Sequence, residues 1–157
     1  MIATRIPAFA LSLITMAATP LLWAADPGGP MQPEEIKWGP APPTLAKGAE
    51  VAVLAGDPAK SGQVTLRLKM PANYAIAPHW HPTDERVTVI SGHLGLGMGD
   101  TLDKKKSKVL KPGGWAVAPA NMHHFAWTKT GAIVQVDLMG PFAITYVNAA
   151  DDPTKKN

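Results

Sequence analysis

The sequence predicts an all-β fold, a double-sheet barrel of the jelly-roll type. Many short runs in which apolar and polar residues alternate are separated by turns rich in glycine and proline. The sequence has no convincing amphipathic helix and no internal repeat, which argues against a helical bundle or a repeat array. With 157 residues the chain is long enough for one domain with its own core. It contains no cysteine, which excludes a thiolate ligand or nucleophile.

Residues 1–25 are predicted to be a secretory signal peptide. The amino terminus and Arg5 supply positive charge, a mostly apolar run follows, and small residues end the segment at Ala25. A membrane anchor is the alternative, but Pro7 and Pro20 interrupt the run, which falls short of the ~20 apolar residues that a span needs. The mature protein is therefore expected in the periplasm or outside the cell.

Residues 26–48 form a proline-rich segment with six prolines around Trp38. Because proline lacks an amide hydrogen and fixes its φ angle, the segment cannot be a long helix. We expect an extended arm that lies over the domain or over a neighbouring subunit, with Trp38 as its anchor; a disordered leader is the alternative. The barrel would then occupy residues 49–148 and a polar tail residues 149–157.

Two strands are predicted over residues 50–54 and 64–70, with turn residues between them. In the second strand apolar side chains alternate with polar ones, so one face is buried. Arg67 lies on the other face. We interpret it as a solvated or packed strand residue rather than as a partner for an acidic ligand.

A His-Trp-His segment is the strongest chemical signal in the chain. In an extended backbone His79 and His81 project to one side and Trp80 to the other, which sets two imidazoles side by side. A bend after Pro82 brings a second run in which Glu85 can return a carboxylate toward them. Imidazole and carboxylate ligands together suit iron, manganese, nickel or zinc.

A second conspicuous segment runs from Gly113 to Phe125. Together the two segments resemble the paired motifs of the cupin superfamily, G-x5-H-x-H-x3-E-x6-G and G-x5-P-x-G-x2-H-x3-N. Seven positions agree in the right order, namely His79, His81, Glu85, Gly92, Gly113, Pro119 and His124. Three depart from it: Asn73 and Asn121 stand where the motifs have glycine, and Thr128 stands where they have asparagine. Asparagine tolerates left-handed backbone geometry best among residues other than glycine, so both turns are expected to form.

This resemblance implies the cupin-type double-stranded β-helix with one divalent metal ion held by His79, His81, Glu85 and His124. Strand alternation lets one of the adjacent histidines 123 and 124 join the cluster, and spacing from the motif proline selects His124; an exchange of their roles is the alternative. The chain is similar to small secreted single-domain cupins and to the cupin module of zinc-binding anti-sigma factors. Cupins commonly pair through sheet edges, so a homodimer is expected.

The remaining strands carry several weaker signals. Leu94, Leu96 and Met98 alternate with glycines and are expected to pack on one side of the strand. The missing side chains of the glycines either give a ligand room or, as we favour, let another backbone approach closely. Residues 103–108 predict a solvated charged loop, and His93 a surface position. Further strands are expected over 132–139 and 142–147. In the first of these, Gln135 and Asp137 either face the interior as partners of the metal histidines or the substrate, or face water.

Two functions are compatible with these motifs. Four protein ligands on a six-coordinate metal leave two positions for a substrate oxygen and dioxygen, which indicates a metal-dependent oxygenase acting on a small organic molecule, with Glu85 as ligand and proton acceptor. The alternative is a binding module without catalytic activity, in which a closed tetrahedral zinc site serves stability or sensing. No serine lies in a nucleophile elbow, which disfavours a hydrolase. A net charge of +3 gives no argument for nucleic-acid or membrane binding.

Overall fold

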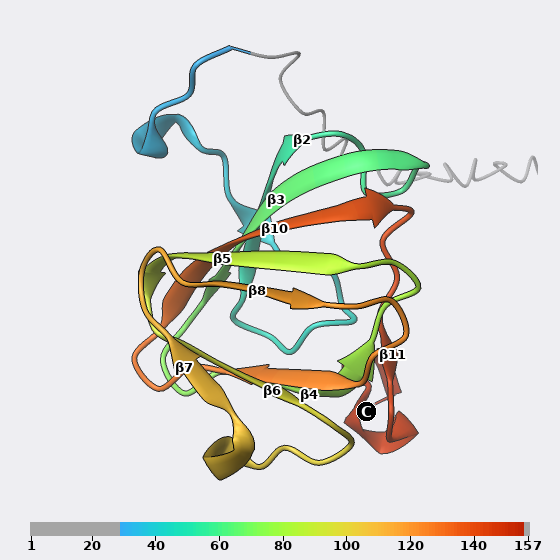
Figure 1. Ribbon diagram of the computed structural model, residues 1–157. Coiled ribbons are helices and arrows are strands. Elements are labelled where there is room, and N and C mark those ends of the chain that lie inside the picture. The colour runs from blue at the N-terminus through green and yellow to red at the C-terminus, as the bar shows by residue number, and fades with distance from the viewer. Residues whose placement is uncertain (1–28, 156–157) are drawn as a thin grey trace, which may run out of the picture.

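The computed structural model describes residues 29–155 and consists of two antiparallel sheets packed face to face (Figure 1). The six-stranded sheet has the order β1-β2-β3-β10-β5-β8 and the five-stranded sheet the order β11-β4-β9-β6-β7. The strands are β1 (Gly39–Pro40), β2 (Glu50–Ala55), β3 (Gly62–Met70), β4 (Ala75–Trp80), β5 (Glu85–Gly92), β6 (Leu94–Met98), β7 (Lys108–Leu110), β8 (Trp115–Ala118), β9 (His124–Trp127), β10 (Ala132–Gly140) and β11 (Thr145–Tyr146). The prediction of an all-β jelly-roll barrel is confirmed.

The helical segments of the described chain are short 3₁₀ turns. They are η1 (Pro33–Glu35), η2 (Lys104–Lys106), η3 (Ala149–Asp151) and η4 (Pro153–Lys155). Between residues 29 and 155 no helix has the length and apolar character needed to cross a membrane. The predicted signal peptide, residues 1–25, lies outside the described residues.

The core lies between the sheets and is built by strand alternation. Every second residue of β3 and β10 is buried, from Val64 to Met70 and from Ala132 to Leu138. β10 pairs with β3 over its whole length and with β5 on its other side, so it is central in the six-stranded sheet. Burial of these apolar side chains supplies the main driving force for closing the two sheets on each other.

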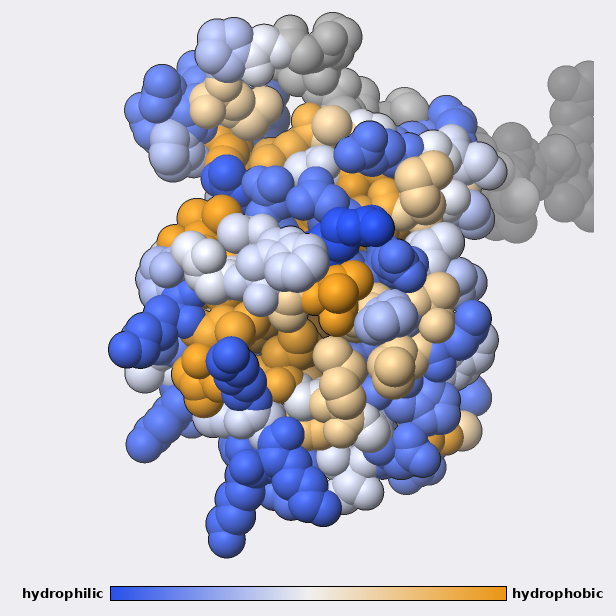
Figure 2. Space-filling view, in the orientation of Figure 1, coloured by the Kyte–Doolittle hydropathy of each residue, from blue (hydrophilic) through white to orange (hydrophobic). Residues whose placement is uncertain are grey.

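The outer face of the six-stranded sheet carries the residues that alternate with this core. Thr65 Oγ1 donates a hydrogen bond of 2.6 Å to Asp137 Oδ1, and Gln135 Nε2 donates one of 3.3 Å to Asp137 Oδ2. Gln135 is also the register partner of Arg67. Gln135 and Asp137 therefore face outward, away from the histidines, and Arg67 is a packed strand residue as expected. In the orientation of Figure 1 this sheet lies toward the viewer, and its surface mixes hydrophilic and hydrophobic residues (Figure 2).

The glycines of β6 are covered by aromatic rings. A Cβ atom on Gly95 would lie 2.2 Å from the indole of Trp127, and one on Gly97 would lie 2.3 Å from Cζ of Phe125. The glycines thus make room for packing within the barrel, but the groups that approach them are aromatic side chains of β9 and not another backbone. Alternation with Leu94 and Leu96 predicts that Met98 packs on the same side, and this is wrong: Met98 is 45% exposed, because β6 ends there and the chain turns at Gly99.

The described part of the proline-rich arm lies over one side of the barrel. β1 pairs with β2 through Gly39 and Val51, and Leu45 is buried in the core. Two phenols hold the backbone that follows β1: Tyr146 donates a hydrogen bond to the carbonyl of Thr44 (2.7 Å) and Tyr74 one to that of Ala46 (2.6 Å). Trp38, farther toward the amino end, is half-buried, with Lys69 Nζ 5.5 Å from its ring.

The strand predicted over 142–147 is shorter than expected. β11 contains two residues and pairs with β4. Ahead of it, the amide of Phe142 donates a hydrogen bond of 2.8 Å to the carbonyl of Pro58, in the loop after β2. The amide is therefore satisfied by a loop carbonyl and takes no part in a sheet. The segment 141–144 closes over one end of the barrel.

Candidate metal centre

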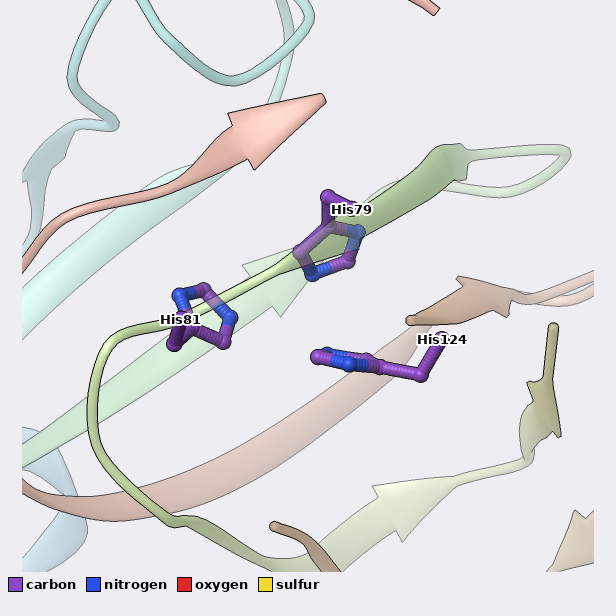
Figure 3. A group of neighbouring side chains, drawn as sticks. All are labelled: His79, His81 and His124. Carbon is purple, nitrogen blue, oxygen red and sulfur yellow. The ribbon is translucent and has the colours of Figure 1, made fainter. Parts of the chain in front are cut away.

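Three histidines converge inside the barrel from two neighbouring strands of the five-stranded sheet. His79 lies on β4, His81 directly after β4, and His124 begins β9, where it is the register partner of His79. All three are at least 95% buried, and one ring nitrogen of each lies within 4.8 Å of the others (Figure 3). Alternation along an extended backbone explains why His79 and His81 share the interior face.

Backbone carbonyls fix the orientation of each imidazole. Nδ1 of His79 lies 2.7 Å from the carbonyl oxygen of Ala77, Nδ1 of His81 2.7 Å from that of Ala143, and Nδ1 of His124 2.9 Å from that of Met122. A carbonyl oxygen only accepts hydrogen bonds, so each Nδ1 carries the hydrogen in the neutral ring. The lone pair is therefore on Nε2, the atom that faces the other histidines. This is how metal-binding histidines are usually oriented by their surroundings.

Two of these Nε2 atoms are buried without a hydrogen-bond partner among the described residues. They belong to His81 and His124. An unpaired buried polar atom costs free energy, so a native structure that keeps two such atoms side by side calls for an additional group. A divalent cation accepts the lone pairs of several imidazoles at once, and the donor set fits iron, manganese, nickel or zinc.

Glu85 places its carboxylate beside this cluster from the opposite sheet. It begins β5, and its Oε1 lies 3.7 Å from Nε2 of His81 while Oε2 lies 3.3 Å from Nε2 of His124. The Glu85 side chain is 14% exposed. Its position matches the fourth ligand expected from sequence, although the group of mutually close ligand atoms is formed by the three histidines.

The charges of the cluster follow from burial and from these short contacts. Burial, reinforced by the neighbouring His124, lowers the pKa of His79 to about 3. Burial raises the pKa of Glu85, but the close contact with Nε2 of His124 and the charges of the three histidines outweigh it and bring that pKa to about 2. Burial also lowers the pKa of His124, and the contact with Glu85 reverses this and raises it. Near neutral pH Glu85 is thus ionised and His79 is neutral.

A cavity of about 360 Å³ opens beside the cluster. His79, His81 and Glu85 form its polar side, and the remaining wall is apolar. That wall comes from the arm, from β2, β3, β4 and β10, and from the loops after β2 and β10; its residues are Pro42, Leu45, Val51, Val53, Pro58, Ala59, Leu66, Leu68, Ile76, Val136, Phe142 and Ile144. A site of this size and lining suits a small organic ligand.

The other residues singled out from sequence lie outside the cluster. Nδ1 of His123 lies 2.6 Å from Oδ1 of Asp100, outside the cluster. His124, and not His123, is therefore the histidine that joins His79 and His81. His93 is exposed, as expected. Thr128, which replaces the asparagine of the motif, is 1% exposed and lies at the end of β9, beyond the cluster.

The left-handed turns expected at both motif asparagines are confirmed. Asn73 has a φ angle of 60° and Asn121 one of 62°. Sequence analysis missed the cavity residues contributed by the arm and by the segment after β10, such as Leu45 and Phe142. These residues lie outside the long strands, where no alternation indicates which side chains point inward.

Comparisons with known proteins agree with this architecture. The family model described as "Domain of unknown function (DUF4437)" matches residues 30–145. No curated protein matches the chain. Among solved structures, the polyketide cyclase RemF from Streptomyces resistomycificus has 18% sequence identity and a TM-score of 0.67, over 80% of this chain and 89% of that one.

Two further structures extend the comparison. An RmlC-like cupin from Shewanella frigidimarina has 16% identity and a TM-score of 0.55, over 69% of this chain and 87% of that one. An oxalate oxidase has 22% identity and a TM-score of 0.51, over 69% of this chain and 60% of that one. At these identities the likeness shows the fold, and the predicted cupin-type fold is confirmed.

Proposed function

We propose that this chain, which belongs to the cupin-like family described as a domain of unknown function (DUF4437), is a metal-dependent enzyme that acts on a small organic molecule, with oxygenation as its reaction class. The observation that carries the proposal is the apolar cavity of about 360 Å³ beside the three histidines. An enzyme needs a position at the metal that substrate can reach, whereas a purely structural site does not.

The proposed ligands are His79, His81 and His124, with Glu85 as the fourth. Their Nε2 atoms converge, and the carbonyls behind each ring hold that orientation before any ion binds. When bound, iron or manganese supplies redox chemistry with dioxygen, and any divalent ion here acts as a Lewis acid. The protein's own contribution is to orient the ligands and to surround the reacting groups with an apolar wall that limits access of water.

Glu85 has two candidate roles, as a ligand and as a catalytic proton acceptor. Its distances of 3.3 and 3.7 Å from two histidine nitrogens suit both. A carboxylate whose pKa is about 2 is a weak base in the metal-free protein, so the ligand role has the stronger support. Glu85→Gln distinguishes the roles: loss of metal indicates a ligand, while retained metal with loss of turnover indicates a proton acceptor.

A zinc-binding module without catalytic activity is the second candidate. The proximity of Glu85 to two histidines favours it, because four side chains are enough for a closed tetrahedral zinc site. In this version the ion stabilises the barrel, and the cavity serves to sense a small molecule.

Location and assembly are also proposals. We propose that residues 1–25 are removed on export, which places the mature protein in the periplasm or outside the cell. We further propose a homodimer, which size-exclusion chromatography with light scattering would test.

The test of the proposed function is metal analysis of protein purified from the periplasm. The same analysis is made on a variant in which His79, His81 and His124 are all changed to alanine. About one equivalent of iron, manganese or nickel, absent from the variant, supports the enzyme and justifies a screen for oxygen consumption. Stoichiometric zinc, lost together with thermal stability, supports the module. A His93→Ala, His123→Ala variant is the matched control and should keep its metal.

A further inference from the structure

The cavity beside the histidines has an unusual charge composition for a ligand site. Its lining, as the structure describes it, contains one carboxylate, Glu85, and no lysine or arginine. Arg67 does not reach the cavity, because it alternates with the lining residues Leu66 and Leu68 and so projects to the opposite face of β3. A ligand inside this cavity therefore meets a cation only at the metal centre.

The charges at the site can be counted from these groups. A divalent ion brings two positive charges, Glu85 removes one, and the three histidines bind as neutral rings. One positive charge remains for the ligand. A singly ionised ligand leaves the buried site neutral, whereas a dianion leaves an uncompensated negative charge against an apolar wall, which is strongly unfavourable.

The shape of the cavity adds a second restriction. Leu66, Leu68 and Val136 contribute a buried aliphatic wall, whereas other lining residues, including Val53 and Phe142, are half-buried. The ring of Phe142 lies 5.4 Å from that of His81, so a flat ligand that reaches the metal passes close to an aromatic ring. A volume of about 360 Å³ is near the lower end of the ~300–1,000 Å³ found for small-molecule sites, which suits one or two rings.

We propose that the ligand is a compact apolar molecule with one oxygen donor that ionises once, such as a phenol, an enol or a monocarboxylic acid, and that the site excludes dianions. The donor binds the metal beside Glu85, and the hydrocarbon body fills the cavity. This substrate class rests on the proposed function, since it requires a metal held by the histidines.

A panel of naphthalene derivatives tests the proposal by calorimetry, with no turnover needed. The probes are naphthalene, 2-naphthol, 2-naphthoate and naphthalene-2,3-dicarboxylate, each titrated into metal-free protein and into protein loaded with one equivalent of Zn²⁺. We expect naphthalene to bind both forms alike. Zinc should strengthen binding of 2-naphthol, 2-naphthoate or both by at least ~10-fold. The tighter binder shows whether the oxygen donor that the site prefers is a hydroxyl or a carboxylate. The dicarboxylate should bind the zinc form at least ~100-fold more weakly than the better of these two.

Val53→Arg tests the charge argument separately. Val53 is half-buried and lines the cavity, so an arginine there supplies the missing countercharge on the partly exposed side of the wall. We expect the variant to narrow the difference between dicarboxylate and monoacid by ~10-fold or more. Val53→Gln controls for size and polarity, and Ile90→Arg adds the same charge at a side chain that is 40% exposed and outside the cavity. Neither control should admit the dicarboxylate.

The possible results separate the two proposals. Tight, zinc-dependent binding of the dicarboxylate to the unmodified protein would overturn the substrate class and leave the metal centre intact. Equal binding of both 2-naphthol and 2-naphthoate with and without zinc would instead contradict the proposed function, on which the class depends. Failure of naphthalene and of both monoacids to bind either form would overturn the cavity as a ligand site. The naphthalene panel tests the proposed ligand class with the unmodified protein, so the test stands even if Val53→Arg does not fold.

Discussion

Replacing Gly97 by alanine should destabilise the barrel and weaken the metal centre together. Gly97 lies opposite Phe125 on the neighbouring strand, and a Cβ atom there would be 2.3 Å from Cζ of that ring. The ring is 0% exposed, so it cannot move into solvent to avoid the contact. The backbone of Gly97 does not have the left-handed φ that would itself strain an alanine, so the cost is steric.

The size of the effect follows from overpacking a close-packed interior. Added methyl groups in such positions cost about 1–3 kcal/mol of unfolding free energy, which lowers Tm by roughly 2–8 °C for each kcal/mol, depending on domain size. Phe125 directly follows His124, so displacement of the ring also shifts a proposed ligand. We therefore expect weaker zinc binding as well as lower stability.

Thermal unfolding and zinc calorimetry measure the two effects. The double variant Gly97→Ala, Phe125→Leu should recover part of the lost Tm, because the smaller side chain leaves room for the methyl group. Gly29→Ala is the matched control, since a Cβ atom there meets no other atom within 4 Å. An unchanged Tm in the Gly97→Ala variant would refute the packing argument.

Three further predictions concern the ligands, the arm and the turns. The contact with Glu85 raises the pKa of His124 above its ordinary 6.5, so a proton competes with the metal for this ring. Metal affinity should therefore be low below this pKa, rise with pH and level off above it. A metal affinity that does not change between about pH 6 and 8 would contradict this prediction. Tyr146→Phe removes the hydrogen bond to Thr44 and should cost about 0.5–1.5 kcal/mol in denaturant unfolding, with faster amide exchange in the arm; unchanged exchange would exclude that role. Asn121→Ala should cost about 1–2 kcal/mol because φ is 62°, while Asn121→Gly should cost less, and the reverse order would disprove the backbone explanation.

Local sequence patterns were sufficient to predict the strand core and the shared direction of His79 and His81, whereas His124 was assigned to the cluster from the resemblance to cupins. His79 and His81 are two residues apart in an extended segment, so their common direction is a property of the backbone itself. The turn at Asn121 follows from the tolerance of asparagine for a left-handed φ, which is likewise local. The fourth group, Glu85, comes from the other sheet, and its position beside the cluster was expected from the resemblance to cupins and from the short bend before it.

The features that sequence left open depend on which elements meet. Alternation places Gln135 and Asp137 on one face of β10 but does not say which face is inside; the register with β3, which sets Asp137 beside Thr65, decides it. Leu45 enters the core from a proline-rich segment without periodicity. The observed strand is shorter than the one predicted over 142–147, because the amide of Phe142 donates its hydrogen bond to a loop carbonyl and not to a neighbouring strand.

The most direct test of the central claim, one divalent ion on the histidine cluster with a position open to the cavity, is the visible spectrum of the protein titrated with Co²⁺. The account predicts one equivalent bound, with the weak absorption of five- or six-coordinate cobalt, and a spectral change when azide is added. Changing His79, His81 and His124 to alanine should abolish the spectrum. An intense tetrahedral spectrum that azide leaves unchanged, or the absence of bound cobalt, would contradict the account.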